Sequence, residues 1–277
     1  MRAWYCLLLL SLSWMLPAGE TAPELVKAAS QAQQGGKLDD ALKLADRAVE
    51  TDAKYWLAYA IRANIKVERN ELDKAVSDYD KVIELKPDLA PRVHSERGSL
   101  LFKAGKITES LADFDALVKL QPQIEPQLWQ RGIVQYYAGK FEEGRKQFEI
   151  HQTVNGNDVE NSAWHFLCNA RANGIEKARK DIIPIDGDTR VPMKEVHRLY
   201  KGELKVEDVL AAAKAGDPPP ERLKRHLFYA YLYIGLYFEA LGDMEKAREN
   251  ILKAAEGYGE DDYMAAVAKV HAGRFKK

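Results

Sequence analysis

The chain has 277 residues, of which 46% are hydrophobic and 30% charged, a mixture typical of a folded protein rather than a disordered one. Its 41 Lys and Arg residues nearly balance 42 Asp and Glu residues. This balance argues against a general nucleic-acid binder or a protein that binds anionic membranes, because both need a basic surface. Two cysteines are too few for a scaffold held by disulfides.

Residues 1–19 are predicted to be a secretory signal peptide. Arg2 precedes an apolar run from Trp4 to Leu16, and small residues follow up to position 19. A basic start and a short apolar run are typical of such a peptide, and the run is too short to cross a bilayer comfortably. An uncleaved anchor is the alternative. No cysteine directly follows the run as in a bacterial lipoprotein, so we expect a secreted or periplasmic protein without a membrane span after removal of this segment.

A short pattern recurs along the rest of the chain with a period near 34 residues. Its copies begin at 36, 70, 105 and 139, in steps of 34, 35 and 34, and a fifth begins at 242. Each copy opens with Gly or Asn, which can end a helix in the left-handed conformation, so each predicts a turn between two helices. The 103 residues from 139 to 242 leave room for two less regular units.

Small residues flank each predicted turn. Before the turn they are Ala29, Ala63, Gly98, Gly132 and Gly235, and after it Ala41, Ala75, Ser110, Gly144 and Ala247. A large side chain at these positions would push two helices beyond their usual separation of about 8–10 Å. We therefore expect the helices of each pair to approach closely there, beside the residues four positions further on, which are Ala45, Tyr79, Phe114, Phe148 and Ile251.

This pattern resembles the tetratricopeptide repeat family. The copy from Tyr231 to Arg248 matches the family's glycine, aromatic and alanine positions in register. The resemblance covers about residues 22–259 and implies an all-α, right-handed superhelical solenoid of about six to seven helix–turn–helix units over residues 20–259. Residues 260–277 are predicted to form a C-terminal capping helix and tail. A four-helix bundle is the competing interpretation, but it does not explain a repeat phase kept over about 200 residues.

The units between about 160 and 215 depart from the repeat pattern. One helix pair is predicted within 161–183 around Gly174, and another within 192–214 around Gly202, before a proline-rich linker at 216–220. The order of elements in this half is similar to the NlpI-type tetratricopeptide lipoproteins. That likeness implies an adaptor for cell-envelope enzymes, although this chain lacks the lipid-bearing cysteine.

The residues that most resemble catalytic groups are His165 and Cys168. They lie three positions apart, so one helix would place them on one face, as a base and a nucleophile. No glycine elbow or family nucleophile signature accompanies them, and packing inside the array is the preferred interpretation. No histidine pair has the spacing of a helical zinc site, and no phosphate-binding motif occurs, so we expect no metal or cofactor.

In arrays of this family, the first helix of each unit lines a groove. The remaining candidates lie on that groove-lining face. Aromatic residues two turns apart could anchor a peptide, and basic residues could meet its carboxylates. Packing of the aromatic residues against the next unit is the alternative. The candidate peptide-binding residues are Asn64, Arg92, Ser99, Lys103, Trp129, Ile133, Tyr136 and Tyr137.

These features predict a non-enzymatic secreted or periplasmic scaffold that binds a protein or peptide in its groove. A second hypothesis is a structural or homo-oligomeric protein whose groove is filled by another copy or by its own C-terminal segment. A third is an enzyme that uses His165 and Cys168.

Overall fold

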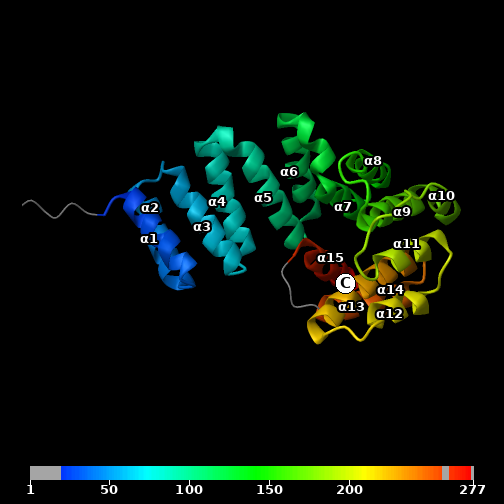
Figure 1. Cartoon of the computed structure of the whole chain (residues 1–277). Coiled ribbons are helices and arrows are strands. Elements are labelled where there is room, and N and C mark those ends of the chain that lie inside the picture. Colours follow the sequence, from blue (N-terminus) through cyan, green and yellow to red (C-terminus); the bar gives the residue numbers. More distant parts are fainter. Residues whose placement is uncertain (1–19, 258–261, 276–277) are drawn as a thin grey trace, which may run out of the picture. The chain divides into compact units, whose positions relative to one another are not determined.

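The computed structural model describes residues 20–257 and 262–275, and every regular element in these ranges is a helix. The all-α class expected from the repeat pattern is therefore confirmed (Figure 1). The signal-peptide prediction for residues 1–19 lies outside the described residues. The chain divides into two compact units, one that ends at Leu85 and one that begins at Lys86.

The first unit contains two antiparallel helix pairs. Helix α1 packs on α2, α3 packs on α4, and α2 also contacts α3. Small buried residues, Ala29, Ala41 and Ala45 among them, form the centre of the first pair, so the two helices approach closely there. The bounds are α1 (Ala22–Gln34), α2 (Leu38–Thr51), α3 (Trp56–Glu68) and α4 (Leu72–Leu85).

The second unit continues the same arrangement and contains the larger core. Its helices pack as consecutive pairs, and α8 also packs on α9. The pairs are α5 (Ala90–Lys103) with α6 (Ile107–Leu120), α7 (Trp129–Tyr137) with α8 (Phe141–His151), α9 (Val159–Asn173) with α10 (Ile175–Lys180), α11 (Met193–Lys201) with α12 (Val206–Lys214), and α13 (Pro220–Ala240) with α14 (Met244–Gly257). Short 3-10 helices, η1 (Pro87–Leu89) and η2 (Pro122–Gln127), precede α5 and α7.

The turns lie where the repeat pattern places them. The residues expected to end the first helices have left-handed backbones, with φ from 59° to 83° at Gly36, Asn70, Gly105, Gly139 and Gly242. At the third of these turns, the Gly105 N–H donates to the carbonyl of Phe102 and the Lys106 N–H to that of Leu101, so both last-turn carbonyls are satisfied. Each copy of the repeated pattern therefore marks the end of the first helix of a pair.

Glycine is required where two helices of a pair touch. A Cβ at Gly132 would lie 2.7 Å from the ring of Phe148, and one at Gly235 would lie 2.7 Å from Ile251. At Gly98 the corresponding distance to Phe114 is 3.2 Å. The close approach predicted for these positions is confirmed, because each glycine faces the larger residue that the pattern pairs with it.

Buried ion pairs also repeat along the array. Arg62 donates to Asp78 on the neighbouring helix, and Arg97 donates to Asp113 in the equivalent place. Asp78 and Asp113 are both buried. A buried carboxylate must be paired to be tolerated, so each bridge fixes the rotation of one helix against its partner.

The less regular units have the helix pairs expected of them. The turn between α9 and α10 is at Gly174, and α11 ends at Gly202, both with positive φ. The segment that contains Pro218 and Pro219 is not helical, and α13 begins at Pro220. No helix in residues 20–257 or 262–275 combines the length and the apolar character needed to cross a bilayer.

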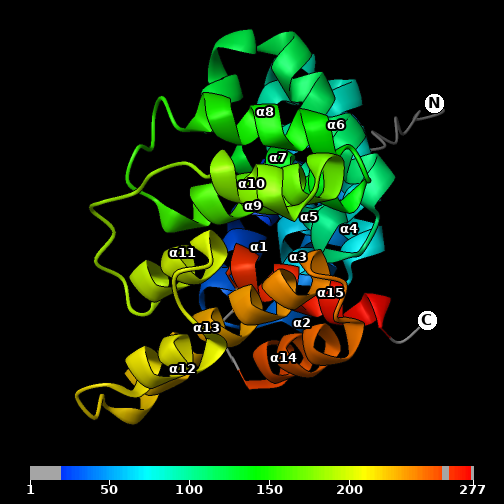
Figure 2. The same ribbon diagram turned by 90° about the vertical axis from the view of Figure 1, so that its right-hand side faces the viewer.

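The chain's last helix, α15 (Tyr263–Arg274), has two neighbours that are far apart in sequence. It packs on α14, as a terminal helix of the array would, and it also contacts α5. Figure 1 shows α15 beside the lower end of α5, and Figure 2 shows it next to α13 and α14. The C-terminal helix thus joins the last pair of the second unit to its first pair.

Candidate functional site

An aromatic cluster joins α15 to α5 and α7. The ring of Tyr263 stacks on Phe102 at 5.2 Å between centroids and meets the Trp129 indole edge-on at 5.0 Å. Phe102 is also in edge contact with Tyr137 at 5.4 Å. Aromatic contacts of this kind add to the free energy of apolar burial, so α15 binds an aromatic face that α5 and α7 supply. We call Phe102, Trp129 and Tyr137 the α5–α7 face.

A buried polar network connects the same helices. The Tyr137 hydroxyl lies 2.9 Å from Nδ1 of His271, and Nε2 of His271 lies 3.0 Å from a carboxylate oxygen of Glu239. Tyr136 donates to the same oxygen of Glu239 at 3.3 Å. Because His271 and Glu239 are almost fully buried, this network specifies how α15 sits between α7 and α13.

Acid should weaken the docking of α15 through Glu239. Burial by itself would raise the pKa of Glu239, but the bond from His271 and nearby guanidinium groups bring the pKa below its ordinary value. Glu239 therefore contributes stability that is complete above its unfolded-state pKa of about 4.3 and is lost as the pH falls through the lower folded-state pKa. We expect Glu239→Gln to make the free energy of unfolding fall less steeply below about pH 5. Urea unfolding at a series of pH values measures this, with the exposed Glu245→Gln as a control that keeps the wild-type slope.

The predicted anchors on α7 differ widely in accessibility. Ile133 and Tyr136 are buried, with exposed fractions of 0% and 2%. Trp129 and Tyr137 are half-buried, and α15 contacts both. The alternative in which aromatic residues pack inside the array therefore describes Tyr136, whereas Trp129 keeps one accessible side.

The polar candidates have contacts of their own. Arg92 is exposed on α5, where it pairs with Glu96, and the Ser99 hydroxyl donates to the carbonyl of Ser95. Lys103 borders a second hollow between α5 and α15, which Tyr137 also lines. Asn64 belongs to α3 in the first unit and accepts a hydrogen bond from Tyr79. Within the second unit, the structure does not gather Arg92, Ser99 and Lys103 into one site.

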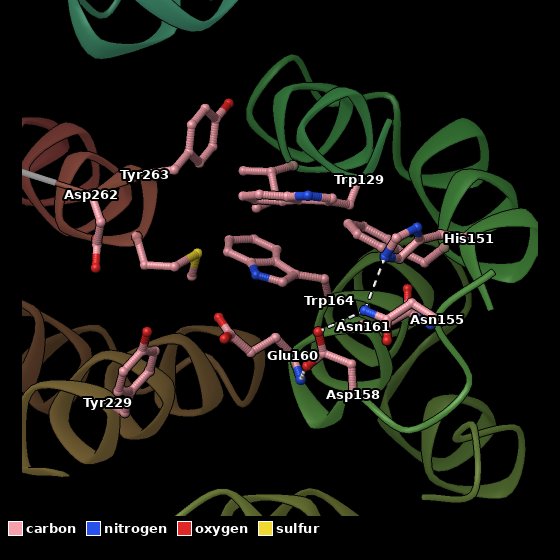
Figure 3. A pocket seen from close by; sticks show the side chains of 13 residues that line it. Trp129, His151, Asn155, Asp158, Glu160, Asn161, Trp164, Tyr229, Asp262 and Tyr263 are labelled. Atoms are coloured by element: carbon pink, nitrogen blue, oxygen red, sulfur yellow. Dashed lines mark hydrogen bonds between the residues drawn. The ribbon is translucent and has the colours of Figure 1, made fainter. Parts of the chain in front are cut away.

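A pocket of about 270 Å³ opens beside Trp129, where α7 and α9 face α13 and α15. Figure 3 shows the indoles of Trp129 and Trp164 one above the other, with Tyr263 and Tyr229 to their left. Phe148 and Met264 supply further apolar lining. We call this hollow the indole pocket. Pockets for drug-sized ligands measure about 300–1,000 Å³, so this one suits a single side chain.

Acidic and amide side chains line the rest of the indole pocket. Asp158 caps the N-terminus of α9 by accepting from the Glu160 N–H, and Asp262 caps α15 by accepting from the Ala265 N–H. Arg190 pairs with Asp158, Glu160 and the buried Asp188, so three carboxylates share one guanidinium. Three carboxylates, those of Asp158, Glu160 and Asp262, line the pocket, and the described lining includes no Lys or Arg.

His165 and Cys168 both lie in the interior of α9. Cys168 has no exposed surface, and its sulfur occupies the space that a Cβ on Gly144 would need. Burial raises the pKa of the Cys168 thiol far above its ordinary value, the opposite of what a nucleophilic cysteine requires. Burial likewise lowers the pKa of His165, whose nearest acidic partner is Glu149 at 3.3 Å. This environment favours a packing role for both residues.

Cys168 should therefore be nearly inert in the folded protein. We expect a thiol reagent at pH 8 to label it at least about a hundred times more slowly than free cysteine, and to label it fully once the protein unfolds. Absorbance during reaction with an aromatic disulfide, with and without denaturant, measures both rates. Rapid labelling of the folded protein near neutral pH would instead revive the enzyme hypothesis.

Comparison with known families identifies the repeated unit. A model of the tetratricopeptide repeat matches residues 26–90 and 62–124, a span that includes the turns at Gly36, Asn70 and Gly105. Residues 26–124 carry tetratricopeptide repeats. The helix pairs and left-handed turns that continue beyond residue 124 follow the same plan.

Solved tetratricopeptide repeat structures extend the likeness over most of the chain. A protein from Parabacteroides merdae matches 90% of this chain and 98% of its own, with 17% identity and a TM-score of 0.58. YrrB, described as a TPR protein with an unusual peptide-binding site, matches 70% of this chain and 92% of its own, with 18% identity and a TM-score of 0.53. At these identities the likeness establishes the solenoid fold, and the specific likeness to NlpI-type proteins stays a prediction.

Several residues of the site were not predicted from the sequence as site residues. Trp164 and Asp158 were not among the candidate binding residues, and nothing in the repeat pattern marks Phe102, Tyr229 or Asp262. The helix caps could have indicated the carboxylates that line the pocket, because an Asp that directly precedes a helix lies at the N-terminus of that helix, near the surface. The approach of α15 to α7 has no such local signal.

Proposed function

We propose that this tetratricopeptide repeat protein is a non-enzymatic scaffold that binds a protein or peptide partner at the indole pocket. The observation that carries this proposal is the pocket, where Trp129 and Trp164 line an accessible hollow next to the face that α15 covers. Rigid aromatic side chains are favoured anchors because they bury a large area and lose few rotamers. The helices that line the pocket pack against neighbouring helices, so the entropic cost of ordering the interface falls mainly on the partner.

The scaffold is further proposed to act outside the cytoplasm, in the periplasm or as a secreted protein. This proposal rests on the basic and apolar character of residues 1–19. A role in cell-envelope assembly or proteolysis rests on the likeness to NlpI-type adaptors. Cell fractionation with an antibody tests the compartment, and N-terminal sequencing of the recovered protein tests the removal of the segment.

Selection from a randomised peptide library tests the binding function. The purified protein should enrich peptides that share a sequence pattern, and Trp129→Ala should reduce their binding by about tenfold or more, because it removes an aromatic anchor. Trp56→Ala is the matched control, since Trp56 is likewise half-buried and likewise begins the first helix of a pair, α3. Failure to enrich any pattern, or equal losses in the two variants, would contradict binding at the pocket.

A filled groove is supported for one part of the second unit. The α5–α7 face is covered by α15 of the same chain, which agrees with the hypothesis of an array that uses its own C-terminal segment as a lining. Homo-oligomerisation stays a prediction, and the molecular mass in solution measured over a dilution series tests it.

A further inference from the structure

The indole pocket combines three properties that point to one kind of guest. Its volume of about 270 Å³ suits one side chain, its walls include Trp129, Trp164 and Tyr263, and its polar lining carries acidic groups. Figure 3 shows Glu160 and Asp158 below the two indoles, with Asp262 across from them beside Tyr263. Aromatic rings attract cations, and carboxylates pair with them, so the walls and the polar lining favour the same charge.

Three buried polar atoms in the lining, the Asn161 oxygen, the Trp164 indole N–H and the Tyr263 hydroxyl, have no hydrogen-bond partner among the described residues. Asn161 and Trp164 are 3% and 1% exposed. The side-chain amide of Asn161 donates to Gln152, but its oxygen has no hydrogen bond, and neither has the indole N–H of Trp164. Buried polar groups are normally paired, so a guest that donates to Asn161 and accepts from Trp164 would complete the lining.

The charge balance of the lining also leaves room for a cation. Arg190 neutralises only part of the charge of Asp158, Glu160 and Asp188. Burial raises the pKa of Glu160 despite the opposing effect of Arg190, which means that its carboxylate is under-compensated. A second guanidinium at the pocket would improve the pairing of these groups.

We propose that the indole pocket binds an arginine side chain of a partner polypeptide. The guanidinium stacks on an indole face and pairs with the carboxylates that line the pocket. Its N–H groups reach the oxygen of Asn161, and a backbone carbonyl of the partner accepts from the Trp164 N–H. Arginine fits better than lysine because its planar, weakly hydrated guanidinium both stacks on rings and forms paired hydrogen bonds to a carboxylate. This inference rests on the proposed function and adds the chemistry of the ligand.

A pair of short peptides tests the inference on the full-length protein. The probes are acetyl-Gly-Ser-Arg-Ser-Gly-amide and the same peptide with citrulline, which keeps the shape of arginine and removes its charge. Fluorine NMR of protein labelled with 5-fluorotryptophan reports the site, with the Trp129 and Trp164 signals assigned by substitution. The arginine peptide should shift both signals saturably and bind about tenfold more tightly than the citrulline peptide. Equal binding of the two peptides, or a response confined to Trp56, would overturn the inference.

A variant that removes two of the carboxylate charges lining the pocket tests their part in binding without breaking a helix cap. Asp158→Asn combined with Asp262→Asn keeps both N-caps, since asparagine caps a helix about as well as aspartate. This variant should lose about tenfold in affinity for the arginine peptide and keep its affinity for the citrulline peptide. Asp243→Asn is the matched control, because Asp243 accepts from the Lys246 N–H at the start of α14 and does not line the pocket.

The outcomes separate this inference from the proposed function. If the library selection enriches peptides that lack basic residues and still depend on Trp129, the scaffold function stands and the arginine assignment falls. If the selection enriches nothing and neither short peptide shifts a tryptophan signal, both fall. The comparison of the two peptides on the wild-type protein needs no variant, so it decides the matter even where the double substitution unfolds the chain.

Discussion

Ending the chain at Gly257, before α15, should lower the free energy of unfolding of the second unit by about 5 kcal/mol or more. The loss removes Met264 and Val267, which are buried, and uncovers Phe102, which has no exposed surface in the complete protein. Each large apolar side chain that leaves the interior costs about 1.5–3 kcal/mol. A helix that covered only the end of the last pair would leave Phe102 and Trp129 untouched.

Three measurements follow the shortened chain. Urea unfolding gives the loss of stability, a dye that binds apolar surfaces reports the uncovered α5–α7 face, and the emission of Trp129 should move to longer wavelength. Lys269→Ala, on the exposed side of α15, is the control and should behave as wild type. An unchanged tryptophan spectrum and unchanged dye binding in the shortened chain would show that α15 does not lie against α7 in solution.

Replacing Phe148 by alanine should cost about 3–5 kcal/mol, and replacing Gly132 by alanine about 1–3 kcal/mol. The first change leaves a cavity in the core, because Phe148 is 1% exposed. The second places a methyl group 2.7 Å from the Phe148 ring. In the double variant the added methyl group enters the space that the ring has left, so the combined loss should be smaller than the sum by at least about 0.5 kcal/mol.

Chemical denaturation of the two single variants and the double variant measures this coupling. Gly235→Ala combined with Phe148→Ala is the matched control, because Gly235 meets Ile251 on a different helix pair. The losses in that control should add to within about 0.5 kcal/mol. Additive losses for Gly132 and Phe148 as well would mean that the two residues do not touch.

Local features of the chain were enough to predict the helix pairs. Gly105 and Lys106 satisfy the last carbonyls of α5 through backbone bonds that involve only their own turn, so a glycine at that phase predicts a helix end wherever it recurs. The contact of Gly132 with Phe148 follows in the same way, since both residues belong to one pair of helices joined by one short turn. Neither feature depends on distant parts of the chain.

The candidate site was only partly predictable. Trp129 was found because an aromatic residue on the first helix of a unit has a known direction, and it does line the indole pocket. Tyr136 was placed on the same face, yet a hydrogen bond to Glu239, 103 residues away, accompanies its burial. The period of a single helix says which residues share a face, but not which later helix covers that face.

The repeat period, the turn residues and the paired small and large side chains were enough to establish an all-α array of tetratricopeptide repeats, because each of these acts within about one repeat. The position of α15 came from folding in three dimensions. Contacts such as those of Tyr263 with Phe102 and of His271 with Tyr137 join helices more than a hundred residues apart and have no period of their own. These long-range contacts leave the α5–α7 face covered and the indole pocket accessible, and so they set which aromatic residues are available to a partner.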